Sequence, residues 1–169
     1  MLIRLSTAGF TLLELLICIS ILAILAVLAV PSFRASLERN EIMTVAEALS
    51  ADLRWSRGEA LKRNVDIKVK FTPGAAGVWE YVITAQAATP VTLKTVKSSQ
   101  SADFKTVALA ENFGSDDIVF NHSRGTTETQ AGAATLTSSH GTYKLNVVVG
   151  NLERVRICSA LGDIGGYDT

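Results

Sequence analysis

The chain has 169 residues, and its 16 Lys and Arg residues balance its 16 Asp and Glu residues. A neutral chain has no overall positive field, so any site for a polyanion must be local. The length suits one compact domain together with a membrane segment, and it is too short for two ordinary domains besides that segment. Apolar residues are concentrated near the N-terminus, and this asymmetry divides the chain.

Residues 10–30 form an apolar run that is long enough to cross a membrane. Their sequence, FTLLELLICISILAILAVLAV, contains one charged residue, Glu14, and about 20 helical residues span a hydrocarbon core of ~30 Å. An ordinary secretory signal has a shorter apolar core followed by its cleavage site, whereas here the small residues precede the run. Arg4 favours a cytoplasmic N-terminus. We therefore expect one transmembrane helix, with everything after Val30 outside the cytoplasm.

Glu14 is unfavourable in lipid and is expected to have a partner. A carboxylate costs roughly 2.5 to 3.5 kcal/mol at the centre of a membrane on insertion scales. If the chain is cut after Gly9, the new amino group of Phe10 lies four residues before Glu14. That ammonium can neutralise the carboxylate on the same helix or on a neighbouring one. In the alternative, Glu14 lies at the interface and reaches water.

The junction between Gly9 and Phe10 belongs to a longer motif. Gly9, Phe10, Thr-Leu-Leu, Glu14, the apolar run and Pro31 follow in order, and together they resemble the class III signal of type IV pilins and type II secretion pseudopilins. The resemblance implies that a prepilin peptidase removes residues 1–9 and methylates the amine of Phe10. Glu14 would pair with the amino terminus of an adjacent pilin during assembly.

The same resemblance implies a location. The precursor would be a single-pass protein of the bacterial inner membrane with its head in the periplasm. It would then enter a pilus or pseudopilus at the cell surface, where the N-terminal helix contacts other major and minor pilins.

Residues 31–64 are predicted to continue the helix beyond the membrane. Pro31 lacks an N–H and clashes with the preceding turn, so we expect it to kink or locally melt the helix. Beyond it, apolar residues recur at helical spacing. These residues are Ile42, Val45, Leu49 and Leu53. One face of this amphipathic helix is expected to pack on the head.

Residues 65–169 are predicted to form a β-rich head with a flexible C-terminal tail. Ile67, Val69 and Phe71 alternate with polar residues, and a turn follows at Pro73–Gly77. Further strand-like runs are Trp79–Thr84, Val91–Val96, Thr106–Ala110, Ile118–Phe120, Ala134–Thr137, Tyr143–Val149 and Glu153–Cys158. The fold class is α+β, a long kinked N-terminal helix packed on an antiparallel, sandwich-like head. The polar stretch Thr95–Asp103 is expected to be a mobile loop.

Three segments narrow the resemblance within the pilin-like proteins. ADLRWSRGEALKRNVDIKV at 51–69, FNHSRGT at 120–126 and RVRICSALGDIGGY at 154–167 resemble the FimT and GspH group of minor pilins and minor pseudopilins, and most of all FimT. In FimT-type minor pilins of natural transformation, an arginine-bearing C-terminal region contacts DNA. The resemblance therefore implies that this chain binds double-stranded DNA without sequence preference.

The residues that match this region are Arg154 and Arg156. A spacing of two on a strand directs both side chains to one face, where they could hold successive phosphates. Lys144 and Arg124 would extend the patch if the fold brings them near. The alternative is the solvated face of an edge strand whose other face buries Val155 and Ile157. The chain would then be a structural minor pilin that primes or caps the pilus, or a GspH-like minor pseudopilin of type II secretion, without DNA binding.

No catalytic, metal or cofactor site is predicted. His122 and His140 lack further ligands at metal-binding spacing, and the sequence has no nucleophile motif or phosphate-binding loop. We therefore expect no enzyme activity and no cofactor. Cys18 lies in the apolar run and Cys158 near the other end, so no internal disulfide is expected. Cys158 could pair with another chain or remain a buried thiol.

Overall fold

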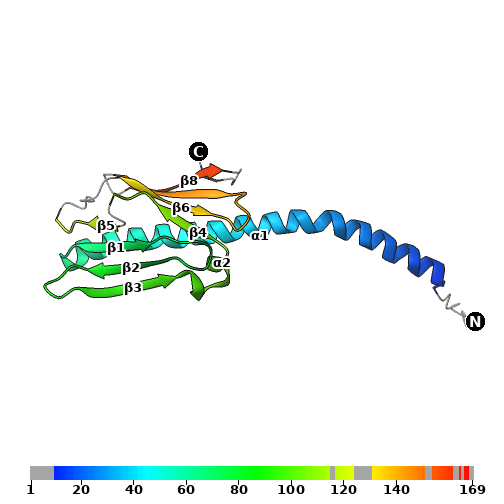
Figure 1. Cartoon of the computed structure of the whole chain (residues 1–169), viewed down its shortest axis with the longest axis horizontal. Coiled ribbons are helices and arrows are strands. Elements are labelled where there is room, and N and C mark those ends of the chain that lie inside the picture. Colours follow the sequence, from blue (N-terminus) through cyan, green and yellow to red (C-terminus); the bar gives the residue numbers. More distant parts are fainter. Residues whose placement is uncertain are drawn as a thin grey trace, which may run out of the picture. The chain divides into compact units, whose positions relative to one another are not determined.

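The computed structural model describes residues 10–114, 117–123, 131–150, 154–161, 164 and 166–167. Helix α1 (Leu12–Arg63) is followed by strands β1 to β8 (Figure 1). The chain divides into two compact units, the first ending at Leu37 and the second beginning at Glu38.

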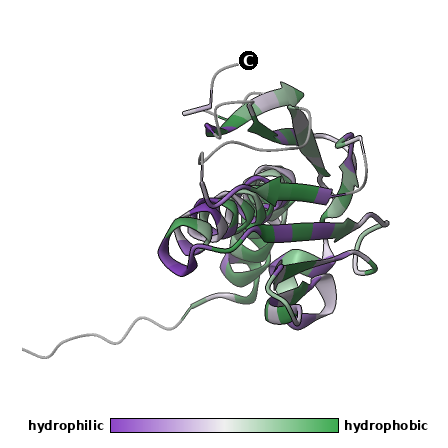
Figure 2. Cartoon of the chain, turned by 90° about the vertical axis from the view of Figure 1, so that its left-hand side faces the viewer, coloured by the Kyte–Doolittle hydropathy of each residue, from purple (hydrophilic) through white to green (hydrophobic). Residues whose placement is uncertain are grey.

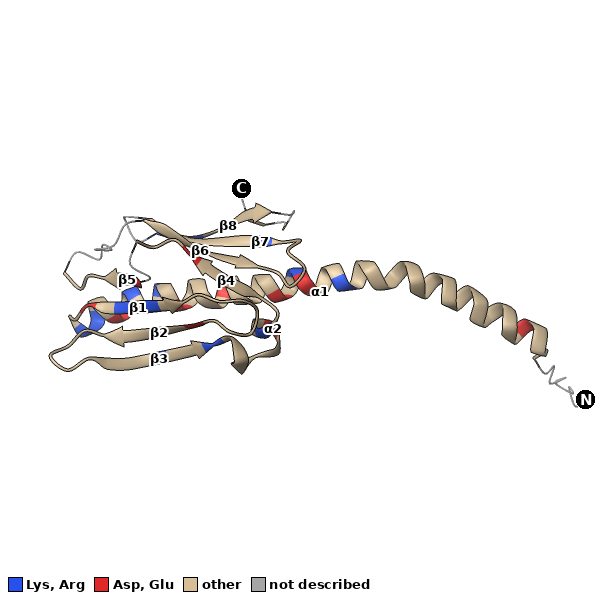
Figure 3. Cartoon of the chain, viewed as in Figure 1, with Lys and Arg blue, Asp and Glu red and all other residues tan. Residues whose placement is uncertain are grey.

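The first unit contains the apolar part of α1. No charged residue lies between Glu14 and Arg34 (Figure 3), and the helix is long and apolar enough to cross a membrane. Pro31 lies inside α1 and the helix continues through it, so the predicted local melting is not observed. A proline removes one intrahelical hydrogen bond, which the flanking turns tolerate. The kink at Pro31 stays a prediction.

The second unit begins with the remaining part of α1, which packs on the strands. The predicted apolar stripe of Ile42, Val45, Leu49 and Leu53 is confirmed, since each is at most 2% exposed. Figure 2, a view from the end of the head, shows this part of the helix beside the strands. The helix ends where Asn64 adopts a left-handed conformation with φ of 56°, a common way to terminate a helix.

The described residues of the head form two antiparallel sheets. The first has the order β3-β2-β1-β5, and the second has the order β4-β6-β7-β8. The strands of the first sheet are β1 (Ile67–Thr72), β2 (Glu80–Ala85), β3 (Val91–Lys97) and β5 (Asp117–Phe120). Those of the second sheet are β4 (Ala108–Glu111), β6 (Gly132–Thr137), β7 (Lys144–Val149) and β8 (Val155–Leu161). The predicted α+β fold with an antiparallel head is confirmed.

The core of the head lies between the helix and the two sheets. Alternate residues of the strands point into it, as the period of two predicts. Phe71, Tyr81 and Leu145 are examples, each at most 2% exposed. The described core residues run from Ile42 to Ile164 and so belong to the second unit. The head therefore has a hydrophobic core of its own.

The prediction of a mobile loop at Thr95–Asp103 is wrong. After β3, a 3-10 turn η1 (Ser98–Gln100) and a short helix α2 (Ala102–Lys105) follow. The Ser98 N–H donates to the Trp79 carbonyl at 2.9 Å, and the ring of Phe104 stacks on that of Trp79 with centroids 5.8 Å apart. The polar residues are ordered because the apolar Phe104 beside them anchors the segment to the core.

Candidate functional site

Arg154 and Arg156 lie at the edge of the second sheet. β8 pairs with β7 and forms the end of the strand order. The Arg154 carbonyl accepts a hydrogen bond from the Gly150 N–H at 3.2 Å, so pairing starts one residue before β8. Arg156 lies opposite Val148. Both arginines are exposed, as the sequence predicts.

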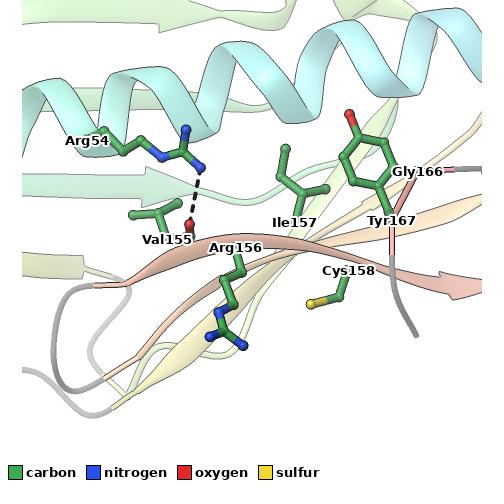
Figure 4. Close-up of a pocket in the computed structure, with 7 residues that line it drawn as sticks. All are labelled: Arg54, Val155, Arg156, Ile157, Cys158, Gly166 and Tyr167. Carbon is green, nitrogen blue, oxygen red and sulfur yellow. Dashed lines mark hydrogen bonds between the residues drawn. The ribbon is translucent and has the colours of Figure 1, made fainter.

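Val155 and Ile157 alternate with the two arginines along the chain, and their side chains face the opposite side of the sheet. Val155 is only 8% exposed. Figure 4 shows the side chain of Ile157 pointing toward α1, whereas Arg156 and Cys158 point to the other side of β8. Within the described part of the chain, neither Arg154 nor Arg156 forms an ion pair. Their positive charges are therefore available on an open face of the sheet.

Arg54 of α1 reaches the same strand. Its Nη2 donates a hydrogen bond to the Val155 carbonyl at 3.2 Å, across 101 positions of sequence (Figure 4). Its side chain is exposed and retains further N–H donors after this bond. Sequence reasoning missed Arg54, because a position off the apolar stripe of a helix does not reveal which distant strand lies beside it.

A pocket of about 510 Å³ lies between α1 and β8. It is lined by Arg54, by residues 155–158 of β8, and by Gly166 and Tyr167 near the C-terminus. The Tyr167 hydroxyl donates to Glu47 Oε1 at 2.8 Å. Burial and this hydrogen bond both raise the pKa of Tyr167. The hydroxyl is therefore engaged with α1, and the pocket combines the ring of Tyr167 with the guanidinium group of Arg54.

The other predicted DNA-contacting residues do not join this group. Lys144 is the first residue of β7 and lies opposite Leu161, at the far end of β8. From Lys144 to Val148, the partner of Arg156, the strand rises about 13 Å at ~3.3 Å per residue. Arg124 lies outside the described residues. The structure therefore supplies Arg54, rather than Lys144, as the neighbour of the two arginines.

At the other end of the chain, Gly9 lies outside the described residues and Phe10 is 80% exposed. The Thr11 hydroxyl accepts a hydrogen bond from the Glu14 N–H at 3.2 Å, which makes Thr11 the cap of the helix. Thr11 and Glu14 also match the spacing of a capping box, Thr-x-x-Glu. Among the described residues, Glu14 has no ion-pair partner.

The two histidines bind carboxylates and hold loops in place. Asp66 Oδ1 accepts from the His122 N–H at 2.9 Å and lies 2.7 Å from the His122 Nδ1. Glu38 Oε1 accepts from the His140 N–H at 3.0 Å. Burial raises the pKa of Glu38, but hydrogen bonds from His140 and Ser139 outweigh it and the net pKa is lowered. The described residues contain no group of three metal-ligand side chains.

The family model of the type II transport protein GspH matches residues 45–152, which is more than half of the chain. The chain belongs to the GspH family. The prokaryotic N-terminal methylation motif matches residues 4–30 of this GspH-family chain. The predicted membership of the FimT and GspH group is thereby confirmed.

Two solved structures share the fold. One is the minor pseudopilin EpsH from the type 2 secretion system of Vibrio cholerae, with a TM-score of 0.56 and 11% identity over 70% of this chain and 97% of that one. The other is the type IV minor pilin FimU of Pseudomonas aeruginosa, with a TM-score of 0.53 and 20% identity over 75% of this chain and 92% of that one. No curated protein matches the chain significantly.

These findings identify a GspH-family protein with an N-terminal methylation motif, whose fold is shared with a minor pseudopilin and with a type IV minor pilin. The methylation motif together with the apolar helix indicates a membrane-anchored protein. Family membership implies prepilin processing and association with other pilins.

Proposed function

We propose that this GspH-family chain is a minor type IV pilin that binds extracellular DNA, without sequence preference, for uptake in natural transformation. The observation that carries the proposal is the exposure of Arg154 and Arg156 on an edge strand, with no acidic partner among the described residues. Arginines bind phosphate oxygens through charge and paired hydrogen bonds, and phosphates carry no sequence information.

We also propose how the N-terminal region of the chain takes part in assembly. Residues 1–9 are the leader, residues 10–30 cross the inner membrane, residues 31–64 continue into the head, and residues 65–169 form the periplasmic head. After cleavage, the methylated amine of Phe10 pairs with Glu14 of an adjacent subunit. Support comes from the methylation motif at 4–30 and from the absence of a described ion-pair partner for Glu14. The subunit then carries its arginines to the cell surface in a pilus.

The test is DNA binding by the full-length chain in a non-ionic detergent. Two fluorescent duplexes of unrelated sequence should bind with similar affinity, and the affinity should fall steeply with salt. Arg154→Ala combined with Arg156→Ala should weaken binding and reduce the slope of log K against log salt by about 1.8, because each phosphate contact contributes ~0.9. The matched control is Lys70→Ala with Lys105→Ala, which removes two exposed charges from other elements.

No binding at low salt, or an affinity that the two-arginine variant leaves unchanged, would remove the DNA function. The alternative is a structural subunit that primes or caps the pilus, or a minor pseudopilin of type II secretion. The match to the type II transport protein GspH favours the second of these, a minor pseudopilin of type II secretion. Deletion of the gene would then abolish piliation or secretion, rather than transformation alone.

A further inference from the structure

The free edge of β8 presents backbone groups as well as arginines. In an antiparallel ladder, residues alternate between hydrogen-bonded and non-hydrogen-bonded pairs. The bond from the Gly150 N–H to the Arg154 carbonyl places Arg154 in the first kind of pair, and the regular register places Arg156 there too. Val155 and Ile157 therefore turn their N–H and C=O groups away from β7, toward the pocket.

These outward groups are only partly satisfied. Arg54 donates to the Val155 carbonyl, but no described residue accepts a hydrogen bond from the Ile157 N–H. In an extended chain, the carbonyl of one residue and the N–H of the second residue after it are neighbours on the same edge. The Arg54 guanidinium therefore lies beside an unpaired backbone donor, and both residues line the same pocket.

The described lining of this pocket offers hydrogen-bond donors but no carboxylate. Among the described residues that line it, Arg54 and Arg156 are the charged ones and none is a carboxylate. Arg54 has no ion-pair partner in the described part of the chain. Guanidinium groups and a free backbone N–H together recognise the oxygens of a phosphate group. The volume of about 510 Å³ is larger than one phosphate group requires, so a phosphate group has room there.

We propose that Arg54 and the Ile157 N–H form a seat for one phosphodiester group of a DNA strand that runs along the free edge of β8. This inference rests on the proposed DNA function and adds a contact from α1. Arg54 approaches the edge from the helix side, whereas Arg156 points to the other side of β8 (Figure 4). Arg154, two residues before Arg156, shares the face of Arg156 by the alternation of an extended strand. The bond to the Val155 carbonyl holds the guanidinium beside the strand edge before any DNA is bound.

The experiment compares Arg54→Gln and Arg54→Lys in the full-length chain in non-ionic detergent, with Lys70→Gln as the control for the loss of one exposed charge. Arg54→Gln should lower the affinity for duplex DNA several-fold at low salt and reduce the salt slope by about 0.9. Arg54→Lys should keep the slope of the wild type, because it keeps the charge. In ¹⁵N spectra, the Ile157 amide signal should shift when DNA is added to the wild type and shift less in Arg54→Gln.

The outcomes separate this inference from the DNA function itself. If Arg154→Ala with Arg156→Ala weakens DNA binding but Arg54→Gln does not, Arg54 does not bind a phosphodiester group, and the proposed DNA function is retained. If Arg54→Gln and Arg54→Lys weaken DNA binding equally and leave the slope of log K against log salt unchanged, Arg54 only positions β8. The proposed phosphate contact of Arg54 is then wrong as well. If Arg54→Gln disrupts association with other subunits and leaves DNA binding intact, the pocket belongs to a protein interface. If the wild type binds no DNA, both proposals fall.

Discussion

Arg54 differs from Arg154 and Arg156 in how its side chain is held. The hydrogen bond to the Val155 carbonyl restricts the Arg54 side chain before any ligand arrives, whereas Arg154 and Arg156 have no side-chain partner among the described residues. Ordering a free arginine costs up to ~2 kcal/mol of rotamer entropy. Part of this cost is already met in the fold at Arg54, so one charge there should contribute more affinity than one charge on the outer face.

At the same scale, Asp66 should make the stability of the head depend on pH. The backbone N–H of His122, then its ring, lower the pKa of Asp66, and burial opposes them. Because the folded pKa lies below the unfolded one, the stabilisation is present above the unfolded pKa of about 3.9 and is lost as the pH falls through the folded pKa. Asp66→Asn should lower the free energy of unfolding by about 1 kcal/mol at pH 7.

Urea titrations at several pH values between neutrality and pH 3 test this prediction. The wild type should lose more stability toward acid than Asp66→Asn, so the two curves should converge. Curves that run parallel down to the lowest pH would show that the contact between Asp66 and His122 does not contribute through the charge of the carboxylate.

At the scale of the elements, α1 joins the two sheets through residues only two positions apart. Asp52 accepts from the Tyr81 hydroxyl of β2 at 2.8 Å and from Lys94 of β3 at 2.6 Å. Arg54 instead contacts β8 of the second sheet. Two positions on a helix correspond to a rotation of about 200°, so the two side chains leave α1 in nearly opposite directions. The helix therefore sets the position of β8 relative to the first sheet.

The start of β6 depends on a close approach of Gly132 to an aromatic ring. A Cβ at Gly132 would lie 2.4 Å from Cδ1 of Phe113. That ring is 3% exposed and stacks on Phe71 with centroids 5.5 Å apart. Gly132→Ala should therefore destabilise the head by about 1 to 3 kcal/mol, the usual cost of overpacking.

Thermal and urea unfolding would measure the change. Gly58→Ala is the contrasting control, since nothing lies within 4 Å of its added Cβ and alanine is the better helix former by about 1 kcal/mol. It should stabilise the chain. A Gly132→Ala protein as stable as the wild type would mean that Phe113 moves aside without cost.

For the whole molecule, the division into two units separates assembly from folding. Glu14 belongs to the unit that ends at Leu37, and the described core begins at Ile42. Glu14→Gln should therefore leave the melting temperature of the head unchanged, while it reduces co-purification with other pilins from membranes, because a neutral amide cannot pair with an ammonium in lipid. An altered melting temperature, or full co-purification, would contradict this assignment.

The sequence by itself determined the features that depend on near neighbours along the chain. The leader motif around Phe10, the apolar run, the helical stripe from Ile42 to Leu53 and the positions of the strands follow from periods of 3.6 and 2. The outward direction of Arg154 and Arg156 followed from the same alternation. Each of these patterns lies within one element, so it can be recognised without knowing which elements touch.

Only the tertiary structure decided which elements meet. The antiparallel register places Lys144 at the far end of β8 from Arg156, and it brings Arg54 to Val155 across 101 positions. The tertiary structure also orders Ser98–Gln100 and Ala102–Lys105, because the ring of Phe104 stacks on that of Trp79 in the core. Sheet order and register are set by the packing of the whole core, which no local period encodes.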